Sequence, residues 1–523
     1  MTRGRGIARA GLVVTAAFLL SRVLGWVRLV VLGGTFGADG ELDTFFAAFR
    51  IPDLIFQLVA AGALSSALIP IVAGLLTTGE PARAWRVVST VITLMLGALA
   101  VLAATLAVLA SSIVPAITPG FSAAQIAQTV DLTRIMLASP ILLALGAVAT
   151  SVLNAHGRFA VAAFAPVMYN LAIIGGALVL APSMGVTGLA VGVVAGSALH
   201  LVVQVRPLLR TGFRYQPVVD LEDPAGRRAL ALMAPRALGM GASQITFVVA
   251  TTLASGLGAG AISAFNFAFT LLQIPIGVIG VPLGVVVFPS MARDLASGAV
   301  GDYLRLVTRS VRLLLFVMIP ITGLAIVLRR EIVTLLFDYG RFDERAITLT
   351  SDAFLCFVIG LAAHSVIAVL ARAFYAGQDT RTPVAVAILA VAINSSLAVV
   401  LVGPLGLQGL ALAIAVAAWV EAVVLLSLLR RRRPGLNLMR IATMGALGTI
   451  ATLVAAGVAL LANLAAIDLL GRDPARLLLA VQAAGVAAIG SAVYVSMALA
   501  LRIPELPSIV EVVTDLIRRR GRS

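Results

Sequence analysis

The chain is divided into long apolar blocks, separated by short segments that carry charges, glycines or prolines. Each block is near or above the ~20 residues that an α-helix needs to cross the hydrocarbon of a bilayer. A transmembrane β-barrel would instead show alternating polarity in segments of about ten residues. The pattern predicts an all-α polytopic membrane protein of about 14 transmembrane helices, near residues 8–35, 41–77, 84–114, 125–154, 159–181, 186–209, 227–256, 261–291, 304–328, 347–376, 382–402, 406–430, 440–468 and 475–501.

Arginine is concentrated in every second loop between these blocks. The intervening loops, such as 115–124 and 257–260, are poor in arginine or mixed, and 329–346 is the exception, with four arginines partly offset by acids. Because positive loops stay on the cytoplasmic side, both termini are expected in the cytoplasm of a bacterial cell, with the chain crossing its cytoplasmic (inner) membrane. The opening residues resemble a signal peptide, but the apolar run continues to Gly34 without a cleavage site, so we interpret it as a retained first helix.

Composition supports the membrane class. The 523 residues are 61% hydrophobic and 12% charged, against roughly half and a quarter in soluble domains. The net charge of +15 comes from arginines in short loops, which argues against a nucleic-acid-binding face. One cysteine and three scattered histidines predict no metal and no cofactor, and no phosphate loop or catalytic serine motif is present. A transporter is favoured over an enzyme.

An internal repeat is visible in the spacing of landmark residues. Pro70 and Gly79 recur as Pro289 and Gly298 at an offset of 219, and GVTGLA at 185–190 recurs as GLQGLA at 406–411. Six helices per copy keep the same orientation, an arrangement that places a substrate site between two lobes. The predicted domains are an N-lobe (1–215), a C-lobe (216–433), two appended helices (434–502) and a cytoplasmic amphipathic tail (503–523). Duplicated packing without a cavity is the alternative.

Three arginines lie inside the first two predicted spans: Arg22, Arg28 and Arg50. Arg22 lies about 20 Å along the helix, near mid-membrane. Because a charge at this depth is costly, it usually faces a cavity or a partner. The guanidinium fork suits phosphate, since it donates two parallel hydrogen bonds. We interpret the three arginines as a cationic patch that binds a diphosphate.

Other polar and bending residues in the spans have supporting roles in this interpretation. Ser21, Asp43 and Asp53 are predicted gate or orienting residues, and Pro52, Pro275 and Gly277 are predicted hinges. Alternatively, Asp43 and Asp53 neutralise the arginines and only lock the first two helices together. Asp131 is expected to pair with Arg134, and Asn170 and Asn394 to hydrogen-bond neighbouring helices. Asp352, Arg372 and Glu421 are expected to pair or to form a proton or ion site.

Several motifs resemble the MurJ/MviN lipid II flippase family of the multidrug/oligosaccharidyl-lipid/polysaccharide exporter superfamily. They are SRVLGWVR at 21–28, DTFFAAFRIPD at 43–53, NAHGRF at 154–159, IPIGV at 274–278, FDYGRF at 337–342 and FYAGQDTRTP at 374–383. The resemblance implies fourteen helices in two lobes and lipid II, the undecaprenyl-diphosphate-linked peptidoglycan precursor, as substrate. It implies that Arg22 and Arg28 line a cationic cavity, that Asp43 is functionally important, and that the appended helices are associated with a groove for the polyprenyl tail.

The chain departs from the family pattern in helices 2 and 8. Where many relatives carry arginine pairs or Asp-Arg, this sequence has Phe56-Gln57 and Phe269-Thr270. The sequence therefore predicts a lipid II flippase working by alternating access, driven by the membrane potential or a coupled ion. Membrane lipids, and possible cell-wall synthesis proteins, are the other expected partners. Alternatives are a flippase for another polyprenyl-diphosphate saccharide, a cation-coupled drug exporter, and a non-transport scaffold.

Overall fold

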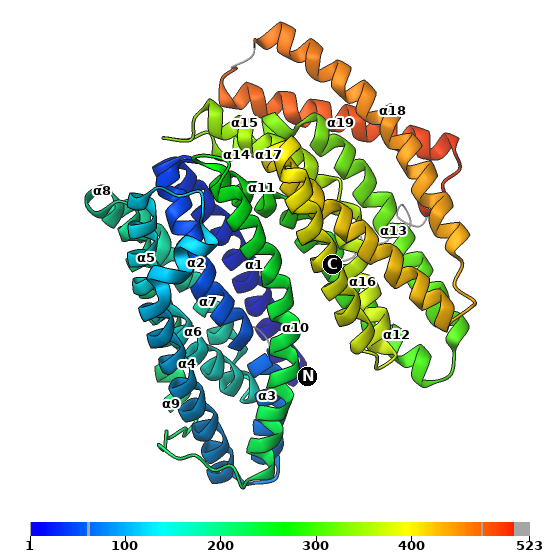
Figure 1. The fold of residues 1–523 in the computed structure, drawn as a ribbon. Coiled ribbons are helices and arrows are strands. Elements are labelled where there is room, and N and C mark those ends of the chain that lie inside the picture. Colours follow the sequence, from blue (N-terminus) through cyan, green and yellow to red (C-terminus); the bar gives the residue numbers. More distant parts are fainter. Residues whose placement is uncertain (1, 60–62, 472–473, 507–523) are drawn as a thin grey trace. The chain divides into compact units, whose positions relative to one another are not determined.

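The computed structural model describes residues 2–59, 63–471 and 474–506, and every regular element in these ranges is a helix (Figure 1). The chain forms two compact units. Unit 1 comprises residues 1–263 together with 339–343, and unit 2 comprises 264–338 and 344–523. The predicted all-α class is confirmed.

Unit 1 contains the helices up to the start of α11. They are α1 (Thr2–Phe36), α2 (Gly40–Val59), α3 (Ala63–Thr77), α4 (Pro81–Ile117), α5 (Ala123–Met136), α6 (Ala138–Ala155), α7 (Phe159–Gly175), the π-helix η1 (Gly176–Leu180), α8 (Ala181–Met184), α9 (Val186–Leu209), α10 (Pro224–Ser255) and the first turn of α11 (Ala261–Pro275). Helix α10 packs against α2, α3 and α4. The compact unit therefore includes a helix that the sequence repeat assigns to the second copy.

Unit 2 contains the rest of α11 and all later helices. They are the π-helix η2 (Ile276–Gly280), α12 (Val281–Ala296), α13 (Val300–Val327), α14 (Arg329–Phe337), α15 (Glu344–Val358), α16 (Leu361–Ala376), α17 (Arg381–Arg432), α18 (Leu438–Leu470) and α19 (Arg476–Ala500). The last two helices pack against each other, and α18 also packs along α13 (Figure 1). The appended pair is thus built onto unit 2. The part of the predicted tail from residue 507 lies outside the described residues.

The predicted count of fourteen spans is not confirmed by helix length and hydropathy. Among the described residues these criteria give ten candidate spans, or up to eleven if the bent pair α15–α16 is one span. One candidate, α17, has 52 residues and would be roughly 78 Å long if straight, more than twice the ~30 Å hydrocarbon. It is interrupted at Gly406 (φ 56°, ψ −132°), so it contains two of the predicted spans. The length and hydropathy criteria do not identify the predicted second span, because α2 carries four charged residues: Glu41, Asp43, Arg50 and Asp53.

The backbone repeats its conformation at the landmarks of the sequence repeat. Gly79 and Gly298 have φ of 78° and 76°. Gly185 (φ 56°, ψ −143°) matches Gly406 (φ 56°, ψ −132°). These positive φ values are strained for side-chain-bearing residues, which explains why glycine stands at both positions of each pair. The two copies thus share local geometry as well as sequence.

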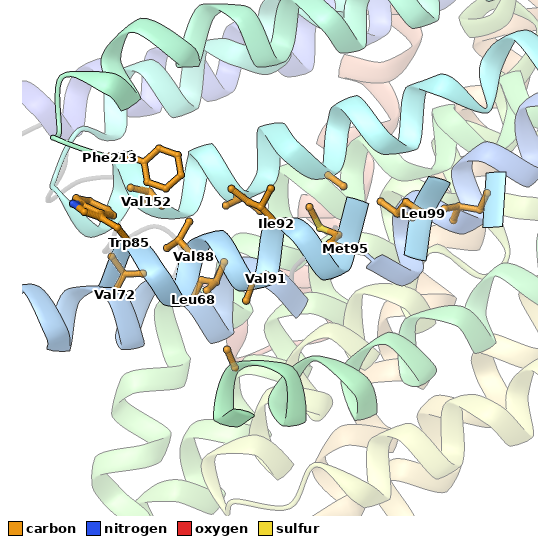
Figure 2. Packing of buried hydrophobic residues seen from close by; sticks show 14 of the residues in the cluster. Leu68, Val72, Trp85, Val88, Val91, Ile92, Met95, Leu99, Val152 and Phe213 are labelled. Carbon is orange, nitrogen blue, oxygen red and sulfur yellow. The ribbon is translucent and has the colours of Figure 1, made fainter. Parts of the chain in front are cut away.

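An apolar cluster of unit 1 runs along α4 and includes the segment that follows α9. Figure 2 shows Trp85, Val88, Ile92, Met95 and Leu99 of α4 in this cluster, with Phe213 close to Trp85. The rings of Trp85 and Phe213 are 5.5 Å apart in an edge-on arrangement, and Phe213 is 6% exposed. The segment before α10 is therefore packed onto α4.

Hydrogen bonds continue this attachment towards α10. The backbone N–H of Asp220 donates to Thr90 Oγ1 at 3.1 Å, and Arg83 forms two hydrogen bonds with Asp223, at 2.7 and 3.1 Å. Asp223 also caps α10 by accepting from the N–H of Ala225. The hydrogen bond from Arg83 is the main reason that the pKa of Asp223 is lowered from its usual value.

The change Asp223→Asn is expected to destabilise the protein at neutral pH only. Because the folded-state pKa is depressed, the ionised carboxylate contributes stability above the unfolded value of about 3.9 and loses it as the pH falls through the folded value. Asparagine still caps a helix, so the change isolates the charge. Thermal unfolding midpoints should differ between the two proteins at pH 7 and converge below about pH 4. Asp302→Asn, in an exposed pair with Arg305, is the control; a constant difference at every pH would contradict the assignment.

Candidate functional site

Two of the predicted substrate-binding arginines lie on α1 in different surroundings. The side chain of Arg22 is exposed, whereas that of Arg28 is half-buried. Arg28 lines a small cavity of about 50 Å³ in unit 1. The other lining residues are Leu29, Leu32, Phe45, Phe46, Phe49, Tyr169, Ile173 and Val193. Among the described residues no ion pair or hydrogen bond engages the Arg28 guanidinium, so its donors are available to a ligand.

The third arginine, Arg50, is held by α10. Its Nε donates to Thr251 Oγ1 at 3.0 Å, and its Cζ lies 5.2 Å from the centre of the Phe247 ring. A cation over an aromatic face is stabilised by the ring quadrupole. Arg50 therefore has a positioning contact that Arg28 lacks.

The carboxylate of Asp53 interacts electrostatically with both Arg28 and Arg50. Asp53 lies within electrostatic reach of both guanidinium groups, and it accepts a hydrogen bond from Gln244 Nε2 at 3.4 Å. One negative charge against two positive charges leaves this cluster with a net positive charge. The cluster has the sign needed to attract an anion.

Asp43 bonds to the turn between α10 and α11. It is 1% exposed, and it accepts hydrogen bonds from the backbone N–H of Gly260, the backbone N–H of Ser263 and Ser263 Oγ at 2.7, 2.7 and 2.6 Å. Gly260 and Ser263 lie at the N-terminus of α11, where helix dipoles favour a negative charge. Asp43 thus ties α2 to the α10–α11 turn. Its geometry fits an orienting role, and its charge is used there rather than against the arginines.

Ser21 and the predicted hinges lie at backbone contacts and irregularities. The carbonyl of Ser21 accepts from Asn170 Nδ2 at 3.3 Å, which confirms the predicted link between Asn170 and a neighbouring helix. Pro52 lies inside α2, Pro275 ends α11, and Gly277 lies in the π-helix η2. Short π-helical turns are rare and occur often at functional sites. The predicted irregularity at Pro275–Gly277 is present, and its role as a hinge stays a prediction.

The remaining intramembrane predictions have mixed outcomes. Asp131 and Arg134 pair at 3.7 Å, as predicted. Asn394 Oδ1 is buried without a hydrogen-bond partner in the described part of the chain, so its predicted interhelical bond is not found. No ion pair among the described residues joins Asp352, Arg372 and Glu421; Arg372 donates instead to the carbonyl of Ala368 in its own helix. The expected pairing of these three residues is therefore not found, and the alternative of a proton or ion site stays a prediction.

Sequence reasoning missed the partners on α10. Gln244, Phe247 and Thr251 contact Asp53 and Arg50, and they follow one another at spacings of three and four. Such residues share one helix face. That spacing was a usable signal, but it does not identify which other helix the face meets.

Unit 2 contains a larger, almost entirely apolar groove of about 640 Å³ between α13, α16, α17 and α18. It is lined by Val311, Leu315, Ile319, Thr322, Gly323, Ile326, Ile359, Ala362, Val366, Trp419, Ala422, Val423, Leu426, Ile441, Ala442, Gly445, Ala446, Thr449, Thr452, Leu453 and Ala456. The volume and lining suit a hydrocarbon chain. Of the appended helices, α18 contributes the wall that closes one side.

Comparison with known families agrees with the motifs. The family described as "Lipid II flippase MurJ" matches residues 32–467. A Burkholderia cenocepacia protein named "Lipid II flippase MurJ" is 33% identical over 81% of this chain and 84% of its own length. The chain belongs to the MurJ family. As a MurJ family member it is a multi-pass bacterial membrane protein.

Solved structures show the same fold. "Lipid II flippase MurJ, inward closed conformation" matches with a TM-score of 0.78 at 22% identity, covering 94% of this chain and 99% of that one. An inward-facing multidrug transporter of the MATE family and MOP superfamily matches with a TM-score of 0.62 at 17% identity, covering 82% and 94%. The chain thus shares its fold with both transporters.

At the two positions where the sequence departs from the MurJ pattern, the side chains make packing or intrahelical contacts. Phe56 packs against the apolar cluster of α3, α4 and α6. Thr270 Oγ1 donates to the carbonyl of Asn266 in the same helix at 2.8 Å. Neither position supplies a cation.

Proposed function

We propose that this protein flips lipid II from the inner to the outer leaflet of the cytoplasmic membrane by alternating access. The observation that carries the proposal is Arg28, a half-buried arginine on a cavity of unit 1 in a chain of the MurJ family. Arg22 and Arg28 bind the diphosphate, while Arg50 and Asp53 position the cluster. Asp43 orients the α2–α11 junction, and Ser21 has a supporting role. Pro52, Pro275 and Gly277 bend the helices as the protein changes state.

The proposed drive is the membrane potential or a coupled ion. A unit charge that crosses 100 mV gains about 2.3 kcal/mol, which is enough to shift a two-state transporter markedly. Both termini are proposed to lie in the cytoplasm, and the protein is proposed to act as a transporter without catalytic chemistry. Lipid II and membrane lipids are the proposed partners, with cell-wall synthesis proteins as further candidates.

Depletion in cells that rely on this protein alone tests the substrate. Lipid II is expected to accumulate on the inner leaflet, measured by the fraction that an externally added lipid II-modifying enzyme cannot reach. Re-expression of the wild-type chain should restore access. Accumulation of a different lipid-linked saccharide, with lipid II still exported, would contradict the proposal.

A second candidate is a flippase for another polyprenyl-diphosphate saccharide. The apolar packing of Phe56 and the helix-bound hydroxyl of Thr270 favour it, because both positions often carry charge in relatives. Binding of purified protein to different lipid-linked sugars separates the two candidates, because only the preferred headgroup should bind tightly.

The groove of unit 2 is proposed to hold the polyprenyl tail. Gly445 lines it, and a Cβ built at Gly445 meets nothing within 4 Å. Gly445→Phe should therefore fold, and its side chain should fill the groove. Burial of each tail CH₂ group contributes about 0.8 kcal/mol, so the loss of several such contacts should lower lipid II export by at least roughly tenfold. Gly457→Phe is the matched control on the same helix, because Gly457 also has open space and does not line the groove. Equal export by the two variants would contradict the assignment.

A further inference from the structure

Tyr169 on α7 lines the same small cavity of unit 1 as Arg28 on α1. Its side chain is half-buried, and among the described residues its hydroxyl has no hydrogen-bond partner. The hydroxyl of a buried tyrosine usually finds such a partner. The cavity therefore contains a polar group that the packing of unit 1 leaves unused, in addition to the guanidinium proposed to bind the substrate.

Contacts with α1 and α9 fix the part of α7 that carries Tyr169. A Cβ built at Gly196 of α9 would lie 3.1 Å from Cδ2 of the Tyr169 ring and 2.8 Å from the Tyr169 carbonyl oxygen. Glycine at this position thus allows the ring to lie directly against α9. The next residue, Asn170, donates hydrogen bonds to the carbonyls of Ser21 on α1 at 3.3 Å and Pro166 on α7 at 3.1 Å. The ring is therefore positioned by packing that does not involve its hydroxyl.

Of the described residues that line this cavity, only Arg28 and Tyr169 have polar side chains. The others are leucine, isoleucine, valine and phenylalanine. Because the cavity is small, about 50 Å³, a group bound in it lies close to both polar side chains. Such a group would have the guanidinium and the phenol as its side-chain hydrogen-bond donors.

The charges near the Tyr169 hydroxyl favour an anionic ligand. The hydroxyl lies within electrostatic reach of the Arg28 guanidinium and the Asp53 carboxylate. A phenol is neutral at pH 7 and can donate one hydrogen bond without adding charge. Hydrogen bonds to an ionised acceptor are roughly twice as strong as those between neutral groups. The unused hydroxyl therefore gains most from an anionic oxygen that Arg28 attracts.

We propose that Tyr169 is a substrate-binding residue, whose hydroxyl donates a hydrogen bond to the same anionic group that Arg28 binds. The inference rests on the proposed function, in which this group is the diphosphate of lipid II. Arg28 supplies the charge that attracts the diphosphate, and the hydroxyl supplies a directed bond from another helix. The site assigned to α1 and α2 thereby extends to α7.

Tyr169→Phe tests the inference, because it removes the hydroxyl and keeps the ring. Affinities of the purified full-length protein in lipid nanodiscs are measured for lipid II and for undecaprenyl diphosphate, which has no saccharide. The variant is expected to bind both lipids at least tenfold more weakly, equivalent to about 1.4 kcal/mol, because they share the diphosphate. Its thermal unfolding midpoint should equal that of wild type, since the hydroxyl has no described partner to lose.

Tyr303→Phe is the matched control. The Tyr303 hydroxyl donates to the carbonyl of Ala373 at 2.9 Å inside unit 2. Its removal should lower the unfolding midpoint and leave the affinity for both lipids unchanged. A double-mutant cycle then tests shared binding: if Arg28 and Tyr169 contact one phosphate group, the effects of Arg28→Ala and Tyr169→Phe on affinity should not be additive.

Three results would overturn the inference. They are wild-type affinity of Tyr169→Phe for both lipids, a loss confined to lipid II, which would place the bond on the saccharide, and fully additive effects in the cycle. Failure of the proposed function gives a different result, because Arg28→Ala would then bind undecaprenyl diphosphate as tightly as wild type. Weak binding by Arg28→Ala with wild-type binding by Tyr169→Phe would remove only the role of Tyr169.

Discussion

Replacing Arg28 with alanine is expected to reduce lipid II export to roughly a tenth or less of the wild-type rate. Hydrogen bonds to charged groups contribute about 1.5–3 kcal/mol, which corresponds to roughly 10- to 150-fold in affinity. Arg28 has no described ion pair or hydrogen bond to compensate, and it lines a small cavity of unit 1. The measurement is inner-leaflet lipid II in cells that depend on the variant, with protein amounts matched by immunoblot.

Two further variants separate charge from geometry. Arg28→Lys keeps the positive charge but loses the planar fork, so intermediate export is expected. Arg134→Ala removes an arginine that is paired with Asp131 and exposed, so export should stay at the wild-type level. Wild-type export by Arg28→Ala would remove the central argument for diphosphate binding by unit 1.

The change Arg312→Ala is expected to produce the largest loss of stability, about 3–5 kcal/mol, because it leaves a buried carboxylate without its partner. Arg312 on α13 pairs with Glu505 at 2.6 Å, and the two side chains are 17% and 9% exposed. The neighbouring Ile503 and Leu506 are 2% and 8% exposed. The pair therefore holds the segment after α19 against α13. The measurement is the apparent unfolding midpoint of the purified protein.

A matched control lies on the same helix. Arg305 pairs with Asp302, but both side chains are more than half exposed, so Arg305→Ala should change stability by about 0–1 kcal/mol. The double variant Arg312→Met with Glu505→Leu should recover much of the loss, since apolar replacement of both partners removes the unpaired charge. Equal effects of Arg312→Ala and Arg305→Ala would show that burial of the pair is unimportant.

Local features of the sequence determined the helical membrane class, the repeat and the family. Hydropathy reports on each segment separately, and glycines such as Gly185 and Gly406 mark backbone conformations that other residues rarely adopt. The arginines of α1 were also predictable as candidates, because a charge within an apolar block is costly wherever the helix packs. The number of membrane spans does not follow from hydropathy alone. The charged residues of α2 lower the hydropathy of a predicted span, and α17 is one long helix that contains two predicted spans joined at Gly406.

Only the tertiary structure decided which polar groups meet. Asp43 bonds to Gly260 and Ser263, more than two hundred residues away, and Arg312 pairs with Glu505, which follows six further helices. The apolar groove likewise needs walls from four helices. Such contacts depend on the packing of distant helix faces, and a helix face carries no information about which neighbour covers it. The sequence thus identified the charges, while the fold decided which of them are neutralised and which can meet a ligand.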